Sequence, residues 1–155
     1  VPGATPSGPA VGGVSPGRST SSAQTYTFTF TDTNGFADLA VMNVLINNAI
    51  SGIGACYIAF VPSGALSGSL FLVDNAGNAA GPFASMTLPG SGSVSNNQCG
   101  INASGSSVSG NGNILTLTLN MTLNPSFFGN KVIYMAARSN ALNSGWQAMG
   151  TVNVP

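Results

Sequence analysis

The sequence predicts an all-β protein in which two sheets pack as a sandwich, and three observations support that prediction. In residues 113–123, leucine or methionine alternates with threonine or asparagine, which is the two-residue period of a strand with one buried face. Clusters of glycine, proline, asparagine and serine separate short apolar segments along the chain, as expected of turns. No segment carries the pattern of a long helix.

The N-terminal residues differ in composition from the rest of the chain. Residues 1–13 are rich in proline, glycine and serine, and we interpret them as an arm or linker ahead of one domain at residues 14–155. Val11 and Val14 are placed to form a short edge strand where the arm meets the domain. A disordered tail is the alternative interpretation.

The first strong strand pattern lies at residues 25–31, where tyrosine and phenylalanine alternate with threonine. Residues 32–35 then predict a turn, followed by one helical turn at 36–39. Residues 40–48 favour a strand over a helix, because they contain β-branched side chains and end in a pair of asparagines.

The remaining elements follow the same logic. Strands are predicted at residues 55–61, 69–73, 93–96, 98–101, 113–123, 131–138 and 146–154. Residues 78–91 and 104–112 predict irregular loops, because they are rich in glycine with proline or serine. A helical turn is expected at 124–129, with Asn124 as its cap and Pro125 at its first position. The total is about 8–9 strands.

Two cysteines, Cys56 and Cys99, stand about 40 residues apart, and the chain has no histidine to complete a zinc site with them. We therefore expect an inter-strand disulfide, with two buried free thiols as the alternative. By the chain-entropy model, closing such a loop stabilises a fold by roughly 4 kcal/mol. A disulfide across facing sheets suits an immunoglobulin-like sandwich; a closed β-barrel is the alternative architecture.

The chain is almost uncharged. Charged residues make up 4% of it, against about 25% in a typical domain, with three lysines or arginines, three aspartates and no glutamate. This composition excludes a basic groove for nucleic acid, and no apolar run is long enough for a membrane span. An uncharged surface lacks the repulsion that keeps domains apart, which favours attached glycans or assembly.

A set of ordered motifs resembles an uncharacterised immunoglobulin-like, or fibronectin-III-like, repeat domain of large secreted bacterial surface proteins. The motifs span about residues 14–155 and are Ser15-Pro16, Thr27 to Asp32 followed by Asn34-Gly35, Asp38-Leu39, Ala55-Cys56-Tyr57, Asn97-Gln98-Cys99, Gly112-Asn113 with Leu115 to Leu119, Phe128-Gly129, Asn143 to Gln147 and Val154-Pro155. The resemblance implies an extracellular, non-catalytic building block. The chain departs from the family pattern in its long arm and in being a single copy.

No catalytic arrangement is recognisable, and we expect no enzymatic activity. Without histidine there is no serine or cysteine triad, and an acid/base pair would have to come from three aspartates, of which Asp32 and Asp38 share a loop and Asp74 lies in another turn. The strongest metal candidate is the turn that contains Asp32, Asn34 and Asp38, whose oxygens suit Ca²⁺. In the alternative interpretation these side chains cap backbone amides and an aspartate pairs with Arg138. No other cofactor is expected.

Two further kinds of surface site are considered. Aromatic residues that stack on sugars are one candidate, formed by Tyr57, Phe127, Phe128, Tyr134 and Trp146. Core packing is favoured for them, because Trp146 has the same alternation as Val152 and Val154. Asn102 and Asn120 each begin an Asn-x-Ser/Thr triplet and are candidate glycosylation sites.

These observations favour an extracellular, cell-surface structural protein, a self-associating subunit or repeat of a fibre or filament. Residues 25–31 and 151–154 are expected to present open edges, to which the arm of a neighbour adds a strand. The assembly candidates are Val11, Val14, Thr116, Thr118, Asn120 and Thr122. Deletion of residues 1–14 is expected to leave a folded monomer. The alternative function is a carbohydrate-binding or adhesive module of a larger secreted protein.

Overall fold

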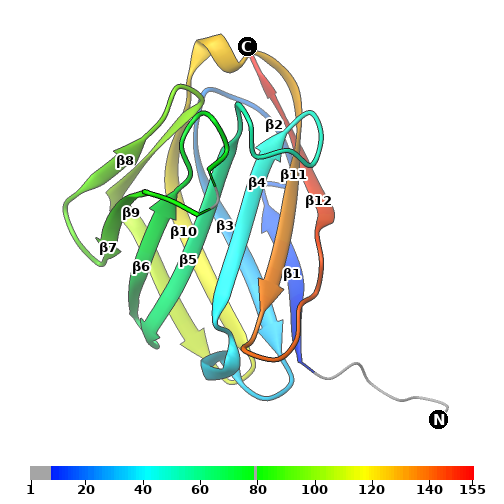
Figure 1. Ribbon diagram of the computed structural model, residues 1–155, viewed down its shortest axis with the longest axis vertical. Helices are drawn as coiled ribbons and strands as arrows, with labels where there is room; N and C mark the ends of the chain where they lie inside the picture. The colour runs from blue at the N-terminus through cyan, green and yellow to red at the C-terminus, as the bar shows by residue number, and fades with distance from the viewer. Residues whose placement is uncertain (1–7, 79) are drawn as a thin grey trace, which may run out of the picture.

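The computed structural model describes residues 8–78 and 80–155, which form two β-sheets packed face to face (Figure 1). The five-stranded sheet contains, in spatial order, β1 (Pro9–Ser15), β3 (Ala23–Asp32), β10 (Ile114–Leu123), β9 (Cys99–Asn111) and β8 (Ser93–Ser95). The seven-stranded sheet contains β2 (Arg18–Thr20), β12 (Gln147–Val154), β11 (Gly129–Arg138), β4 (Val41–Asn47), β5 (Cys56–Gly64), β6 (Ser67–Leu72) and β7 (Ala84–Leu88). Two 3₁₀ turns are η1 (Phe36–Asp38) and η2 (Pro125–Phe127). The predicted all-β sandwich is confirmed, with more strands than the sequence suggested.

The order of the strands matches that of a variable-type immunoglobulin sandwich. In the five-stranded sheet, β1, β3, β10 and β9 take the places of strands A, B, E and D. In the other sheet, β12, β11, β4, β5 and β6 take the places of G, F, C, C′ and C″. Both sheets end in strands that pair on one side only, so the fold is not the closed barrel considered as the alternative.

The strand β10 lies in the middle of its sheet, between β3 and β9. Five of its apolar side chains are at most 1% exposed and form part of the core, namely Leu115, Leu117, Leu119, Met121 and Leu123, whereas Ile114 at its start is 48% exposed. The polar side chains between them lie on the outer face, half-buried or exposed. The alternation in the sequence therefore predicted both faces of this strand correctly.

The strand β9 is the largest departure from the sequence prediction. It extends through most of residues 104–112, which were expected to form a loop, and it pairs with β10 on both sides of one bulge. Ile101, Ala103 and Val108 of this strand are buried in the core. Serine and glycine have little intrinsic preference for strands, so pairing with β10 determines the conformation here.

The N-terminal segment crosses from one sheet to the other. β1 pairs antiparallel with β3, and its Val11 and Val14 pack against the core. β2 then pairs parallel with the last strand, β12. The expected domain boundary between residues 13 and 14 thus falls inside β1, so residues 9–13 belong to the sandwich. Residues 1–7 of the expected arm lie outside the described residues.

This crossing also changes which edges are open. The two segments expected to be open, residues 25–31 in β3 and residues 151–154 in β12, each pair with strands on both sides. The prediction was wrong because β1 and β2 of the same chain cover these two edges. The strands with one open side are β1, β8, β2 and β7.

The predicted disulfide is confirmed. Cys56 on β5 and Cys99 on β9 are bonded, with an S–S distance of 2.02 Å. Since the two strands belong to different sheets, the bridge ties the two layers together. Immunoglobulin domains instead join strands B and F, which correspond to β3 and β11. Neither cysteine is a free thiol.

Candidate ligand-binding groove

The outer face of the seven-stranded sheet is hollowed into a groove of about 690 Å³, formed over β4, β5, β6 and β11 and by the segments before β7 and β12. A sheet face is normally either packed or polar, so an open apolar hollow on it is unusual. The groove has a floor of small side chains and two walls of aromatic rings.

The floor is low because small side chains lie next to each other across three strands. Asn43 of β4 pairs with Ala59 of β5 on one side and with Ala136 of β11 on the other. Val41, also on β4, extends the floor along the strand. Taller side chains flank this row, which gives the face its concave shape.

One wall is formed by Tyr57 and Trp146, whose rings meet edge to face with centroids 5.7 Å apart and planes at 70°. Leu45 of β4 is 1% exposed although it is not part of the core cluster between the sheets. Leu45 pairs with Tyr57 on one side and with Tyr134 on the other. The sheet thus has a small second apolar layer on its outside.

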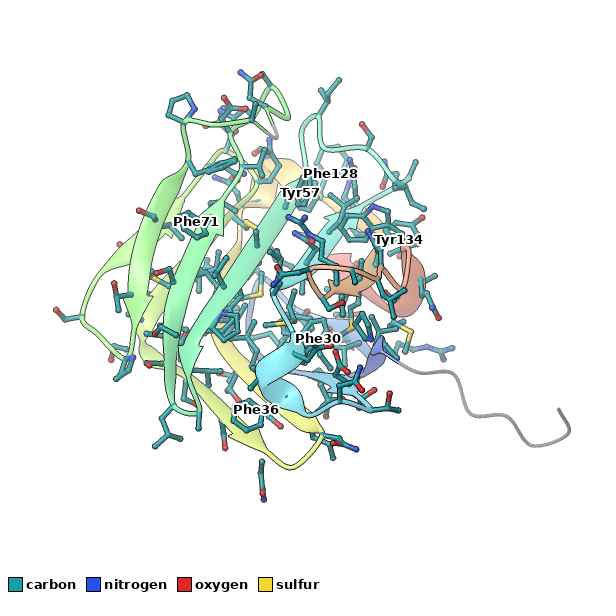
Figure 2. All side chains as sticks on the ribbon, turned by 60° about the horizontal axis from the view of Figure 1, so that its bottom comes forward. Phe30, Phe36, Tyr57, Phe71, Phe128 and Tyr134 are labelled. Carbon is teal, nitrogen blue, oxygen red and sulfur yellow. A yellow bond between two sulfur atoms is a disulfide. The ribbon has the colours of Figure 1, made fainter. Side chains whose placement is uncertain are left out.

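The other wall is formed by Phe71 of β6 and Phe83, whose rings also meet edge to face with centroids 5.9 Å apart. Phe71 pairs with Ala59 of the floor, and Phe83 is 38% exposed. Figure 2 shows Tyr57 and Phe71 on the neighbouring strands β5 and β6, one from each wall. Aromatic rings therefore border the floor on two sides.

The segment that carries Trp146 is held by its own hydrogen bonds. The hydroxyl of Ser144 accepts a hydrogen bond from the backbone N–H of Ala137 at 2.9 Å, and Asn143 Oδ1 accepts one from the N–H of Gly145 at 2.8 Å. Gly145 has a φ of +74°, a conformation that side chains with a Cβ disfavour. These contacts hold the backbone turn directly before Trp146.

Polar groups are few in the groove. Asn43 donates from Nδ2 to the carbonyl of Ile58 at 3.3 Å. Asn143 lines the groove together with Ala136, Ala137 and Arg138 of β11. Arg138 is exposed and is the one charged residue among the described residues that line the groove. No carboxylate is among these lining residues, so the hydrogen-bonding groups of the groove are the amides, the guanidinium, the Tyr57 hydroxyl and the Trp146 indole N–H.

The prediction that Trp146 packs in the core is wrong, and a β-bulge explains the error. Across β11 and β12, Ile133 pairs with Gly150 but the next residue, Tyr134, pairs with Ala148, so Met149 is an extra residue. A bulge of one residue reverses the faces of the strand on either side of it. Val152 and Val154 are buried as predicted, whereas Trp146 lies outside.

Of the five aromatic residues considered from the sequence, Tyr57 and Trp146 meet in the groove. Phe127 is buried, with the Lys131 ammonium 4.3 Å from its ring centre, and Phe128 is 71% exposed away from the groove. Sequence reasoning missed Phe71 and Phe83. One signal was present in the sequence. Phe71 lies between Leu70 and Leu72, which are both in the core, so alternation along the strand predicts that the Phe71 ring lies on the outer face.

The three residues of the calcium candidate lie in one turn, but they differ in burial. Asp32 is buried at the end of β3, whereas Asn34 and Asp38 are exposed in the turn that follows. Burial, and then the nearby carboxyl group of Asp38, raise the pKa of Asp32, while the N–H of Asn34 opposes this by donating to it. Arg138, the cation of the alternative interpretation, lines the groove.

The remaining candidates lie together on the outer face of the five-stranded sheet. Asn102 and Asn120 are paired across β9 and β10, and Asn120 Nδ2 donates to the carbonyl of Ser104 at 3.0 Å. Thr116 and Thr118 are paired with threonines of β3 and serines of β9. Glycosylation at either asparagine, and assembly through this row with Thr122, stay predictions.

Comparisons of this chain with protein-family models, with curated proteins and with solved structures find no match. The resemblance to bacterial surface repeats therefore stays a prediction. Among residues 8–78 and 80–155, no helix has the length and apolar character needed to cross a membrane.

Proposed function

We propose that this protein is a carbohydrate-binding domain that holds a chain of neutral sugars in the groove on its seven-stranded sheet. The observation that carries the proposal is the placement of Tyr57, Trp146, Phe71 and Phe83 around a floor of small side chains. This is the second of the two functions that the sequence suggested, and the groove favours it over the first.

The chemistry of the groove matches that of a sugar ring. A pyranose has an apolar face of C–H groups and a rim of hydroxyl groups, so it needs a flat apolar surface next to a few hydrogen-bonding groups. Aromatic rings supply large apolar area at low entropic cost, and the amides of Asn43 and Asn143 can bond hydroxyls. A charged ligand would find a single partner there, Arg138.

The groove is also arranged in advance of binding. Trp146 is held by the hydrogen bonds of its segment and by the ring of Tyr57, and Phe71 is held by Phe83. Groups that are ordered before binding lose less entropy when the ligand arrives, which improves affinity. The floor of the groove lies on strands, so its backbone does not need to rearrange.

The single tryptophan of the chain gives a direct test. Titration with soluble oligosaccharides of glucose, xylose and N-acetylglucosamine should change the fluorescence of Trp146. The Tyr57→Ala variant should bind at least about tenfold more weakly, since loss of one stacked ring costs about 1.4 kcal/mol or more. Phe128→Ala is the matched control, because this exposed ring is outside the groove, and it should bind like the wild type.

Retention on insoluble polysaccharides should follow the same order of variants. If none of these sugars changes the fluorescence and no polysaccharide retains the wild type, the proposal is wrong. Equal weakening by Tyr57→Ala and Phe128→Ala would place the sugar site elsewhere.

A second candidate function, self-association, is favoured by a different surface. Thr25, Thr27, Thr116, Thr118 and Ser107 lie on neighbouring strands of the outer face of the five-stranded sheet, where cross-strand pairing lines them up. No charge there would repel a second copy. Sedimentation of the wild type should then show oligomers, and Thr118→Lys should disperse them without weakening sugar binding. A monomeric wild type at high concentration would refute this candidate.

The disulfide supports a place in an oxidising compartment. Secretion and a position at the cell surface are part of the proposal, in agreement with a domain that meets polysaccharides outside the cell.

A further inference from the structure

The turn after β3 contains a carboxylate in an unusual position. In β3, alternate side chains point into the core, and the series Phe28, Phe30 and Asp32 places an aspartate where a third aromatic would fit the pattern. Asp32 is 0% exposed. A buried carboxylate is costly unless its oxygens are satisfied by hydrogen bonds, an opposite charge or a metal ion.

Only half of this carboxylate is satisfied. Its Oδ1 atom accepts a hydrogen bond from the backbone N–H of Asn34 at 2.8 Å, as in an ordinary turn. Its Oδ2 atom is buried and has no hydrogen-bond partner among the described residues. Of the three cations of the chain, Lys131 lies over Phe127, Arg138 lines the groove and Arg18 lies on β2, all in the other sheet from β3.

A second carboxylate belongs to the same turn. The turn continues into η1, where the N–H of Asp38 donates to the carbonyl of Gly35 at 3.1 Å. The N–H of Gly35 in turn donates to the carbonyl of Asp32 at 3.0 Å, so the backbone links the two aspartates through one compact turn. The carboxyl group of Asp38 acts on that of Asp32 and adds to the rise of its pKa. Two interacting carboxylates repel each other unless a proton or a cation lies between them.

We propose that Ca²⁺ binds between the Oδ2 atom of Asp32 and the carboxylate of Asp38. Both ligands are hard oxygens, and Ca²⁺ accepts irregular sets of six to eight of them. The site is at the end of the molecule that Figure 2 brings forward, near the labelled Phe36, and Asp38 and Asn34 are exposed there. Water and the Asn34 side chain can therefore supply further ligands.

The proposed calcium site is separate from the sugar groove, but the chain that follows Asp38 continues into the floor of that groove. The N–H of Ala40 donates to the carbonyl of Arg138 at 2.8 Å, and the next residue, Val41, is part of the groove floor. With two carboxylates, the affinity should fall in the range of extracellular calcium modules, with a Kd of about 10⁻⁴ to 10⁻³ M. Bound Ca²⁺ would hold the segment between β3 and β4 in place.

The test is a thermal melt of chelator-treated protein at neutral pH, with and without millimolar CaCl₂, together with calorimetric titration of CaCl₂ alone. Calcium at about ten times Kd should raise the melting temperature by about 3–6 °C. Asp38→Asn should abolish both the shift and the heat of binding. Asp74→Asn is the matched control, because this aspartate lies in a different turn, and it should keep both effects.

Two outcomes would overturn the proposal. The first is an unchanged melt and no heat of binding in the wild type, together with a melting temperature that rises on acidification, which would mean that a shared proton bridges the two carboxyl groups. The second is an equal calcium shift in Asp38→Asn, which would place the ion elsewhere. Sugar titrations play no part in this test, so it does not depend on the proposed function.

Discussion

Trp146 meets Tyr57 edge to face on the outside of the sandwich, with ring centroids 5.7 Å apart, although the two residues lie about 90 positions apart in the sequence. The contact joins the segment before β12 to the start of β5. It turns a flat sheet face into one wall of a groove. The position of this tryptophan separates the two functions considered for the chain, because a buried tryptophan could not contact a ligand.

We therefore expect Trp146 to be accessible in the native protein. Acrylamide should quench its fluorescence substantially without denaturant, at a rate between that of a free indole and that of a buried one, since the side chain is half-buried. Tyr57→Ala should increase the quenching, because it removes one neighbour of the indole. Native fluorescence that resists acrylamide would contradict the groove.

The two faces of β10 should respond very differently to substitution. Leu117 is 1% exposed, and Leu117→Ala should lower the free energy of unfolding by about 2–5 kcal/mol because it leaves a cavity in the core. Thr118→Ala, at the next position but on the outer face, should cost about 1 kcal/mol or less. Urea unfolding of both variants measures the difference, and equal costs would mean that the faces are assigned wrongly.

Removal of the disulfide should destabilise the fold without changing it. The bridge closes a loop over a sequence separation of 43 residues, so the double variant Cys56→Ala, Cys99→Ala should lose about 4 kcal/mol of unfolding free energy. The circular dichroism spectrum of the folded state should be unchanged. The comparison is the wild type under reducing conditions. If the free energy of unfolding falls by less than about 1 kcal/mol in both, the packing of the two sheets does not depend on the disulfide.

The N-terminal strand should be necessary for stability, contrary to the expectation from the sequence. Deletion of residues 1–15 removes β1 with Val11 and Val14, opens the edge of β3 and should cost at least about 3 kcal/mol. A variant that lacks only residues 1–7 keeps β1 and is the matched control. If both deletions unfold at the same urea concentration, β1 contributes nothing to the fold.

Alkaline pH should destabilise the protein through Tyr26. Burial raises the pKa of this phenol above its usual value of 10.0, and a hydrogen bond with Ser19 Oγ at 3.2 Å partly opposes the shift. The unfolded chain then releases the proton first, so stability is complete below about pH 10 and falls as the pH rises through the higher folded pKa. Tyr26→Phe, which cannot ionise, should flatten this dependence in urea unfolding. An equally steep loss in Tyr26→Phe would point to another group.

Alternation in the sequence predicted the core reliably where a strand has one buried and one exposed face. It worked for β3 and β10, whose buried residues are large and apolar with the exception of Asp32, while most of their outer residues are threonines. It failed for β9, because Ser107 and Ser109 carry no pattern of their own and take their conformation from β10. Pairing between distant segments is not visible in a single sequence.

The candidate site was harder to predict for a related reason. A single extra residue, Met149, changes the face on which Trp146 lies, and a bulge leaves no clear trace in the sequence. The floor residues Ala59 and Asn43 also look ordinary in isolation. Their importance comes from lying side by side across strands, with aromatic rings beyond them.

The parallel pairing of β2 with β12 has a mechanical consequence. The N–H of Thr151 donates to the carbonyl of Gly17 at 3.0 Å, and the N–H of Ser21 donates to the carbonyl of Asn153 at 3.1 Å. In Figure 1, β1 begins at the bottom of the molecule and the C-terminus lies at the top. A pulling force applied through the two ends would therefore load the hydrogen bonds of this pair together, in shear. Strands loaded in this way separate only when several bonds break at once, which gives the domain resistance to tension along its long axis.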